Sequence, residues 1–165
     1  MTFEVEAKRG VLSSYGVRTT NQKYGGHIDD DVIKTAQWTF NYNDLPAGAT
    51  NNLGLSIPAN STILSAKMQI ITAFTSTSTT TDLLVGLEQA DGTDIDLDGL
   101  ITAAQATQTT IAVVDSIIDG ASGTPGALIG TTIGAAAGEL IVTSSAADLT
   151  AGKARLIVTY LTRGV

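Results

Sequence analysis

The sequence contains no cysteine, and only 5% of its 165 residues are aromatic. Without cysteine there is no disulfide, no thiolate nucleophile and no cysteine-ligated zinc, so burial of apolar side chains or contact with other chains must stabilise the fold. Long apolar runs are also missing: the most apolar stretch, residues 127–142, carries Glu139 and is shorter than the roughly 20 residues that a membrane-spanning helix needs. The first ten residues include Glu4 and Glu6 and do not match a secretory signal. We therefore expect one soluble chain that does not bind a membrane.

The motifs of catalytic sites are missing as well. A Ser/His/Asp triad would have to use His27, the single histidine, which stands in GGHIDDD, a setting typical of a solvated loop. No G-x-S-x-G motif holds a serine, and neither phosphate-binding glycine motif occurs. A carboxylate pair for glycoside cleavage, such as Glu88 with Asp91, lacks an isolating apolar setting. We therefore predict that the protein is not an enzyme and binds no cofactor.

Charge and aromatic residues are distributed unevenly along the chain. Residues 1–34 hold five basic and five acidic side chains, so the net charge of −7 belongs to residues 35–165. A body of this sign repels phosphate backbones, which argues against nucleic acid as a partner. Six aromatic residues lie within the first 42 positions, and only Phe74 and Tyr160 follow. The N-terminal segment and the body are chemically different.

Residues 1–34 show neither a helical nor a strand period and combine glycines and charges with aromatic side chains. Disordered tails are typically poor in aromatic residues, whereas aromatic side chains supply interface energy at low entropic cost. We therefore predict an extended N-terminal arm over residues 1–34 that orders on a partner surface. A frayed tail is the alternative. Residues 35–165 form the body.

From Trp38 onward, apolar and polar side chains alternate with the period of two that a half-buried strand requires. Proline, glycine and asparagine mark turns between the alternating segments. Many short strands with frequent turns predict an all-β sandwich or barrel. We predict strands over residues 38–42, 53–57, 64–70, 82–88, 139–144 and 154–162, with the last two forming a hairpin and with Trp38 and Phe40 in the core or at the base of the body.

Two segments depart from this pattern. In residues 98–107, Asp98 can act as the N-cap of a short helix that turns Leu100 and Ile101 inward, because an aspartate side chain satisfies the free amides of a first turn. In residues 126–138, glycine recurs every four positions. Four glycines would cost an exposed helix about 3–4 kcal/mol relative to alanine, so we predict irregular or edge structure packed tightly against a neighbour.

Residues 91–105, DGTDIDLDGLITAAQ, partly match the calcium loop of a helix-loop-helix site. Asp94, Asp96 and Asp98 occupy its ligand positions 1, 3 and 5, but position 12 is Gln105, a neutral amide where the loop needs a bidentate glutamate. The preceding segment also alternates like a strand rather than a helix. We predict a solvated acidic turn and no metal, with the three aspartates as the candidate ligands if another kind of calcium site exists.

Part of the body resembles a known family. Residues 45–101 combine an IPAN turn, a long alternating strand, a Thr-rich turn and a strand that ends in an Asp/Gly loop. This order is similar to that of tailed-bacteriophage capsid cement proteins, which decorate and stabilise the head, and LTAGKARLIVTYL (149–161) is similar to their final hairpin. The resemblance covers roughly residues 45–165 and rests on pattern rather than on a catalytic motif.

The resemblance implies a jelly-roll-like antiparallel β-sandwich with a short helix, assembled as a homotrimer on the outside of the virion. Its partner would be the major capsid protein, and the chain would be made in the host cytoplasm. On this interpretation Tyr15, Arg18, Tyr24 and His27 are the candidate capsid-binding residues. Two alternatives stay open: a receptor-binding fibre or appendage module, and a glycan-binding domain with calcium at residues 91–98.

Overall fold

The computed structural model describes residues 6–7, 10–11, 33–45, 50–78, 80–145 and 149–162. The chain divides into two units, Met1–Val32 and Ile33–Val165, which are considered separately. In the first unit, β1 (Glu6–Ala7) and β2 (Gly10–Val11) pair as a short antiparallel ladder. The predicted capsid-binding residues Tyr15, Arg18, Tyr24 and His27 lie outside the described residues.

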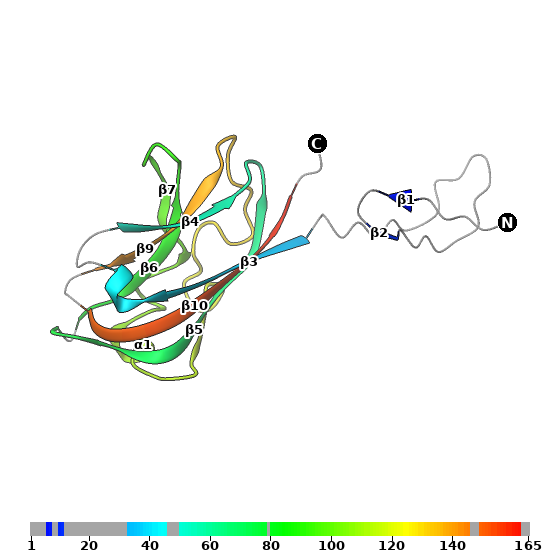
Figure 1. Ribbon diagram of the computed structural model, residues 1–165. Coiled ribbons are helices and arrows are strands. Elements are labelled where there is room, and N and C mark those ends of the chain that lie inside the picture. Colours follow the sequence, from blue (N-terminus) through cyan, green and yellow to red (C-terminus); the bar gives the residue numbers. More distant parts are fainter. Residues whose placement is uncertain are drawn as a thin grey trace. The chain divides into compact units, whose positions relative to one another are not determined.

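The second unit is a sandwich of two four-stranded antiparallel sheets (Figure 1). The first sheet has the order β3-β10-β5-β8 and the second has the order β4-β9-β6-β7. The bounds are β3 (Ile33–Asn41), β4 (Thr50–Ile57), β5 (Thr62–Ser76), β6 (Leu83–Glu88), β7 (Asp94–Ile101), β8 (Ile117–Asp119), β9 (Gly138–Ser144) and β10 (Leu149–Leu161), with a 3-10 helix η1 (Tyr42–Asp44) and a short helix α1 (Gln108–Ile111).

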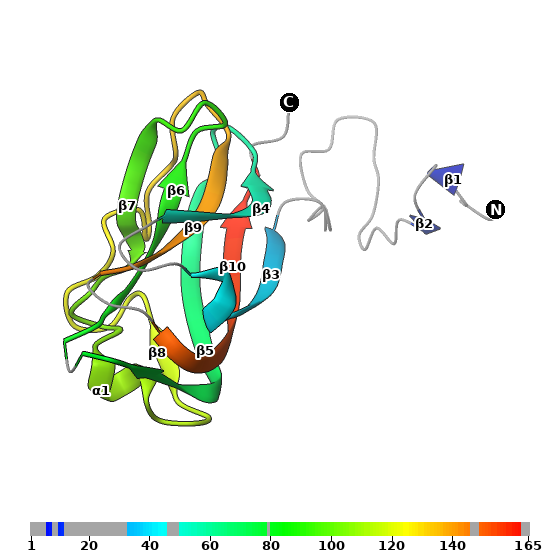
Figure 2. The ribbon, with the colours of Figure 1, turned by 60° about the vertical axis from the view of Figure 1, so that its left-hand side comes forward.

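The strand order is that of a jelly roll. Counted from β3, the first sheet joins strands one, eight, three and six, and the second joins two, seven, four and five. The chain therefore changes sheet at almost every connection, and only β6 and β7 are consecutive neighbours in one sheet (Figure 2). Eight antiparallel strands in two such sheets define the double-sheet jelly roll. The predicted jelly-roll-like sandwich with a short helix is confirmed.

The core lies between the sheets because one side of every strand is apolar. On β10, Ala154, Leu156 and Val158 are buried, while the residues between them are only half-buried. Phe40 is fully buried, and its ring centroid lies 5.7 Å from that of Trp38 and 6.1 Å from that of Phe74. The prediction that Trp38 and Phe40 belong to the core is confirmed, with Trp38 packed against it half-buried.

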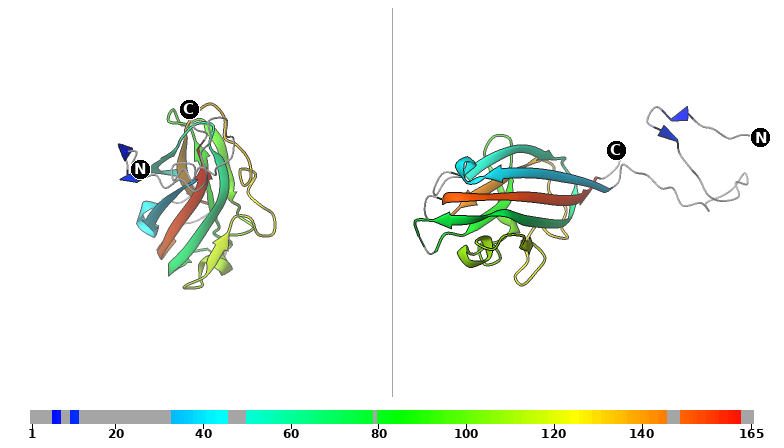
Figure 3. Two further views of the ribbon diagram at one scale, coloured as in Figure 1. Left: turned by 90° about the vertical axis from the view of Figure 1, so that its right-hand side faces the viewer. Right: turned by 60° about the horizontal axis from the view of Figure 1, so that its bottom comes forward.

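A close approach joins the two central strands of the first sheet, which run side by side in Figure 3. Gly152 on β10 has φ +136, and a Cβ added to it would lie 2.1 Å from Cδ1 of Phe74 on β5. A side chain at residue 152 would therefore occupy the space of a core aromatic ring. Glycine lets the bulged end of β10 pass over Phe74.

Two sequence-based predictions are wrong in this part of the chain. The hairpin of residues 139–162 does not form: β9 pairs with β4 and β6 in the second sheet, whereas β10 pairs with β3 and β5 in the first. The helix over residues 98–107 does not form either. Its first residues continue β7, where Ile101 pairs with Val85 and is fully buried, and α1 begins only at Gln108.

The glycine-rich segment is irregular, as predicted. Between β8 and β9 it contains only a bridge from Thr132 to Thr62. An added Cβ at Gly126 would lie 2.3 Å from the carbonyl oxygen of Gly99, and the Leu128 N–H donates to the same oxygen at 2.9 Å. The segment therefore packs directly against the backbone of β7.

Candidate interaction surfaces

The outward side of the first sheet carries Lys67, Lys153 and Arg155, three of the four described basic residues of the second unit; we call this surface the basic face. On β10, side chains alternate between the core and the solvent, so Lys153, Arg155 and Ile157 point outward. Directly paired residues of antiparallel strands point to the same side. Ile157 pairs with Lys67 of β5, which is therefore also on the basic face.

The register continues across the whole sheet. Arg155 pairs with Thr39 on β3 and with Gln69 on β5, and Gln69 pairs with Ile117 on β8. In the adjacent row of the same face, Lys67 pairs with Asp119 on β8. Three cations therefore occupy adjacent rows of the two central strands.

Only one acidic side chain, Asp119, occurs on the described strands of the first sheet. Nζ of Lys67 donates to Oδ2 of Asp119 at 2.9 Å. This hydrogen bond, with a second from the Ala121 N–H, lowers the pKa of Asp119. Nε of Arg155 is buried and has no hydrogen-bond partner within the described part of the chain. Lys67 is thus locally neutralised, while Arg155 keeps an unused donor.

Exposed apolar side chains border the basic face. Ile117 is 64% exposed, and Val113 and Val114 are 55% and 50% exposed. These three residues flank a turn at Asp115, whose φ is +62. The Asp115 N–H donates to the carbonyl of Ile70 at 2.8 Å. The turn is therefore fixed to the edge of β5 while its valines face solvent. Contiguous exposed apolar residues mark interaction surfaces when they gather in this way.

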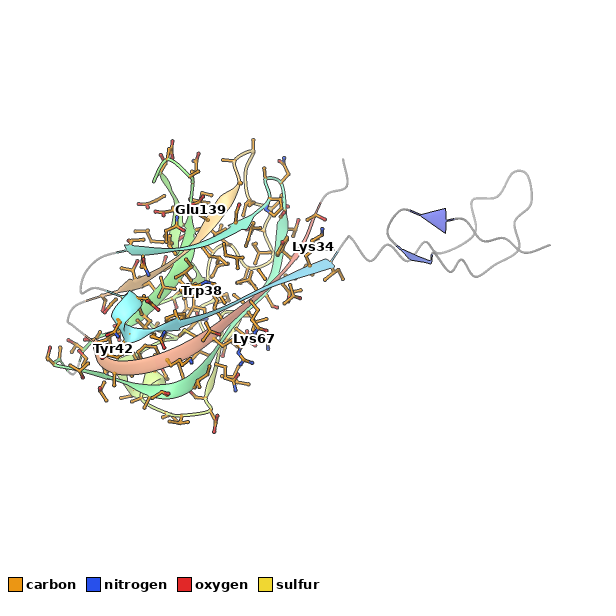
Figure 4. The ribbon with its side chains drawn as sticks, viewed as in Figure 1. Lys34, Trp38, Tyr42, Lys67 and Glu139 are labelled. Atoms are coloured by element: carbon orange, nitrogen blue, oxygen red, sulfur yellow. The ribbon has the colours of Figure 1, made fainter. Side chains whose placement is uncertain are left out.

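The outward side of the second sheet has the opposite charge, and we call it the acidic face. Across the four strands, Glu139 pairs with Ser56 on one side and with Glu88 on the other, and Glu88 pairs with Asp94. These four residues therefore form one row across the sheet. Nδ2 of Asn52 donates to Oε1 of Glu88 at 2.9 Å and also to Oε2 of Glu139. This amide bridges two neighbouring carboxylates. Figure 4 shows Glu139 and Lys67 on different sheets of the sandwich.

The acidic stretch of residues 91–98 is a β-hairpin rather than a loop between helices. The Gly92 N–H donates to the carbonyl of Gln89 at 2.8 Å, and Oδ1 of Asp91 accepts from the Thr93 N–H at 2.9 Å. Asp94, Asp96 and Asp98 lie on β7 itself. The helix-loop-helix calcium alternative is therefore wrong, since β6 and β7 flank the turn.

The three aspartates follow one another along β7. No group of three ligating side chains that could hold an ion occurs in the described ranges. Burial raises the pKa of Asp98, and the neighbouring Asp96 carboxyl raises it further through a hydrogen bond and its charge. The Asp98 N–H donates to Oδ1 of Asp96 at 3.2 Å. The raised pKa means that Asp98 binds a proton more readily than an isolated aspartate does.

No described helix is long and apolar enough to cross a membrane. The chain matches no family model, and no curated protein matches its sequence. A search of solved structures finds a chain of the cyanophage Pam1 capsid asymmetric unit, at 14% sequence identity and a TM-score of 0.57, which covers 89% of this chain and 98% of that chain.

Two further capsid structures share the likeness at lower TM-scores. The acidic stable capsid of Helicobacter pylori bacteriophage KHP30 matches at 18% identity and a TM-score of 0.49, covering 81% of this chain and 90% of that chain. The capsid of Ralstonia phage GP4 matches at 17% identity and a TM-score of 0.48, covering 91% and 94%. At 14% identity, the likeness to the Pam1 chain shows a shared fold.

The sequence analysis overlooked the two charged faces. The alternation around Lys67 and around Arg155 does indicate that both side chains point away from the core. It does not indicate that β5 and β10 are neighbours, because 86 positions separate Arg155 from its partner Gln69 (155 − 69) and 90 separate Ile157 from Lys67 (157 − 67). Only the strand order brings these cations together.

Proposed function

We propose that the protein is a structural component of a phage virion that binds the outer surface of the capsid and cements neighbouring major capsid subunits. The observation that carries this proposal is the match to the Pam1 capsid chain, because the jelly roll spans nearly the full length of that chain. The two proteins therefore share a complete unit rather than a fragment. The sequence pattern of residues 45–101 and 149–161 supports the same function independently.

The mechanism follows from linkage. A protein that binds an assembled shell, but not separated subunits, stabilises the shell by its binding free energy. A homotrimer would strengthen the effect, because attachment of one copy holds the other two at high local concentration. In this proposal the chain acts by binding and has no catalytic role.

The N-terminal arm, residues 1–34, is the proposed capsid-contacting element, with Tyr15, Arg18, Tyr24 and His27 as contacts. The body carries a net charge of −7, while the arm is neutral and holds aromatic residues. Aromatic and arginine side chains dominate the binding energy of protein interfaces. An arm of this composition suits a protein surface.

Mixing purified protein with expanded, undecorated heads of its phage tests the proposal. We expect saturable binding that can be counted as copies per head, and weaker binding by a Tyr15→Ala/Tyr24→Ala variant. A Tyr42→Ala variant is the matched control, because Tyr42 is an aromatic residue of the body outside the arm. Binding to host cells or glycans but not to heads would contradict the proposal and favour a receptor-binding appendage module.

Light scattering tests the homotrimer. Three chains of 16.9 kDa give a particle of about 51 kDa (3 × 16.9), whereas a particle of 16.9 kDa would contradict trimer formation.

A further inference from the structure

The body has a strong charge asymmetry between its two sheets. All four described basic side chains of the second unit lie on strands of the first sheet: Lys34, Lys67, Lys153 and Arg155. The second sheet and its β6–β7 turn carry six acidic side chains and no basic one: Glu88, Asp91, Asp94, Asp96, Asp98 and Glu139. Sheets of a sandwich pack about 10 Å apart, so opposite charges are separated across the thickness of the body.

Both faces also present apolar side chains among their charges. On the basic face, Ile157 is in the row of Lys67, and the exposed Ile117 is in the row of Arg155. On the acidic face, an added Cβ at Gly86 would lie 2.0 Å from the carbonyl oxygen of Asp96 and 2.4 Å from the backbone of Leu97. The backbone of β7 therefore crosses over the outward side of Gly86, where Leu97 is 37% exposed.

We propose that the basic face of one copy binds the acidic face of a second copy of this chain. Lys153 and Arg155 would oppose the row of Glu139, Glu88 and Asp94, and Ile117 would meet the apolar surface around Leu97. The contact depends only on the two faces and not on the proposed function.

A contact between unlike faces is heterologous. Such contacts close into a ring when the rotation between copies allows it, and otherwise continue as a row. An open row leaves one free basic face at one end and one free acidic face at the other end. Two copies with a net charge of −7 repel each other in most orientations, so the attraction is limited to the orientation that pairs the faces.

Salt dependence alone does not separate this contact from apolar association. The Debye length is about 30 Å at 0.01 M and about 3 Å at 1 M ionic strength. Whether added salt weakens or strengthens association of the wild type depends on the balance between face pairing and net repulsion. Reversing the charges of one face avoids this problem, because it changes which pairs of copies carry complementary faces.

The experiment uses two charge-reversed full-length variants. Lys153→Glu/Arg155→Glu makes the basic face acidic, and Glu88→Lys/Glu139→Lys reverses two of the three acidic residues in the row that includes Asp94, so that this row becomes net positive. We expect each variant alone to self-associate at least about tenfold more weakly than the wild type, because like charges now face each other. We expect the 1:1 mixture to associate again, measured by sedimentation velocity at low salt after circular dichroism has verified folding.

Two variants that reverse no charge keep the test valid if a reversed variant does not fold. Lys153→Gln/Arg155→Gln should weaken association, whereas Ala104→Glu/Ala112→Glu, which changes the net charge equally at exposed positions outside both faces, should weaken it less. Equal effects of these two variants would overturn the proposal, as would a mixture of reversed variants that associates no better than its components. If the basic-face variants lose head binding but self-associate as the wild type does, the basic face binds an acidic foreign protein instead. That result would also overturn the proposal.

Discussion

The packing of Gly152 against Phe74 allows a stability test of the strand order. Alanine at residue 152 would place a Cβ 2.1 Å from Cδ1 of Phe74, a distance that real Cβ atoms do not adopt. The ring has little room to move, because Phe74 is fully buried and its ring centroid lies 6.1 Å from that of Phe40. Overpacking of this kind costs about 1–3 kcal/mol, and a left-handed backbone adds about 1–2 kcal/mol for a residue other than glycine.

Gly152→Ala should therefore lower the free energy of unfolding by about 2–5 kcal/mol. At about 2–4 °C per kcal/mol for a chain of this size, the midpoint of thermal unfolding should fall by roughly 4–20 °C. Calorimetry or circular dichroism measures this shift. Alanine substitutions at two other glycines separate the steric cost from the backbone cost. Gly54→Ala, at φ +67 with nothing nearby, should show the backbone term alone, and Gly134→Ala, in open space, should change little.

A double-mutant cycle isolates the contact itself. In a Phe74→Ala background the steric term disappears, so Gly152→Ala should cost only its backbone term of about 1–2 kcal/mol. Equal costs of Gly152→Ala in the wild-type and Phe74→Ala backgrounds would refute the reasoning. Such a result would mean that β10 does not pass over Phe74.

Two further predictions concern the acidic residues. Because the pKa of Asp98 is raised by burial and by Asp96, ionised Asp98 opposes folding above that pKa, and the penalty vanishes below the pKa of the unfolded chain. Asp98→Asn should thus raise the unfolding midpoint at pH 7 and not at pH 3; a larger gain at pH 3 would contradict this. Asn52→Ala removes the amide between Glu88 and Glu139 and should cost about 1–3 kcal/mol at pH 7 by urea denaturation. An Asn52→Ala variant that is as stable as the wild type would count against the bridge.

Alternation in the sequence located most strands of the body. Lys67, between Ala66 and Met68, lies in β5, and the 82–88 segment is β6 with bounds Leu83–Glu88. The Thr-rich stretch was expected to be a turn, but β5 continues to Ser76 before the turn begins. Threonine favours strands as well as turns because it is β-branched, so composition alone does not place the boundary.

Alternation indicates which side of a strand is buried but not which sheet the strand joins. Residues 139–144 and 154–162 alternate and follow each other closely, which favours a hairpin, yet β9 and β10 bury their apolar sides from opposite sheets. The helix at Asp98 failed for a related reason. The adjacent Leu100 and Ile101 fit a helix turn, but they are also buried where β7 makes a bulge against β6.

The candidate surfaces were beyond sequence reasoning for the same reason. Lys67 and Arg155 are each visible as outward-facing, but their proximity depends on the long-range register between β5 and β10. The prediction that residues 1–34 contact a capsid stays a prediction.

The thermal stability of phage heads tests the central claim, cementing, most directly. Linkage predicts that protein present at about 100 times its dissociation constant stabilises each bound site by about 2.7 kcal/mol. Expanded, undecorated heads should therefore release their contents at a higher temperature when the protein is added, and the increase should grow with the number of bound copies. Heads that bind the protein but open at the same temperature with and without it would contradict the claim.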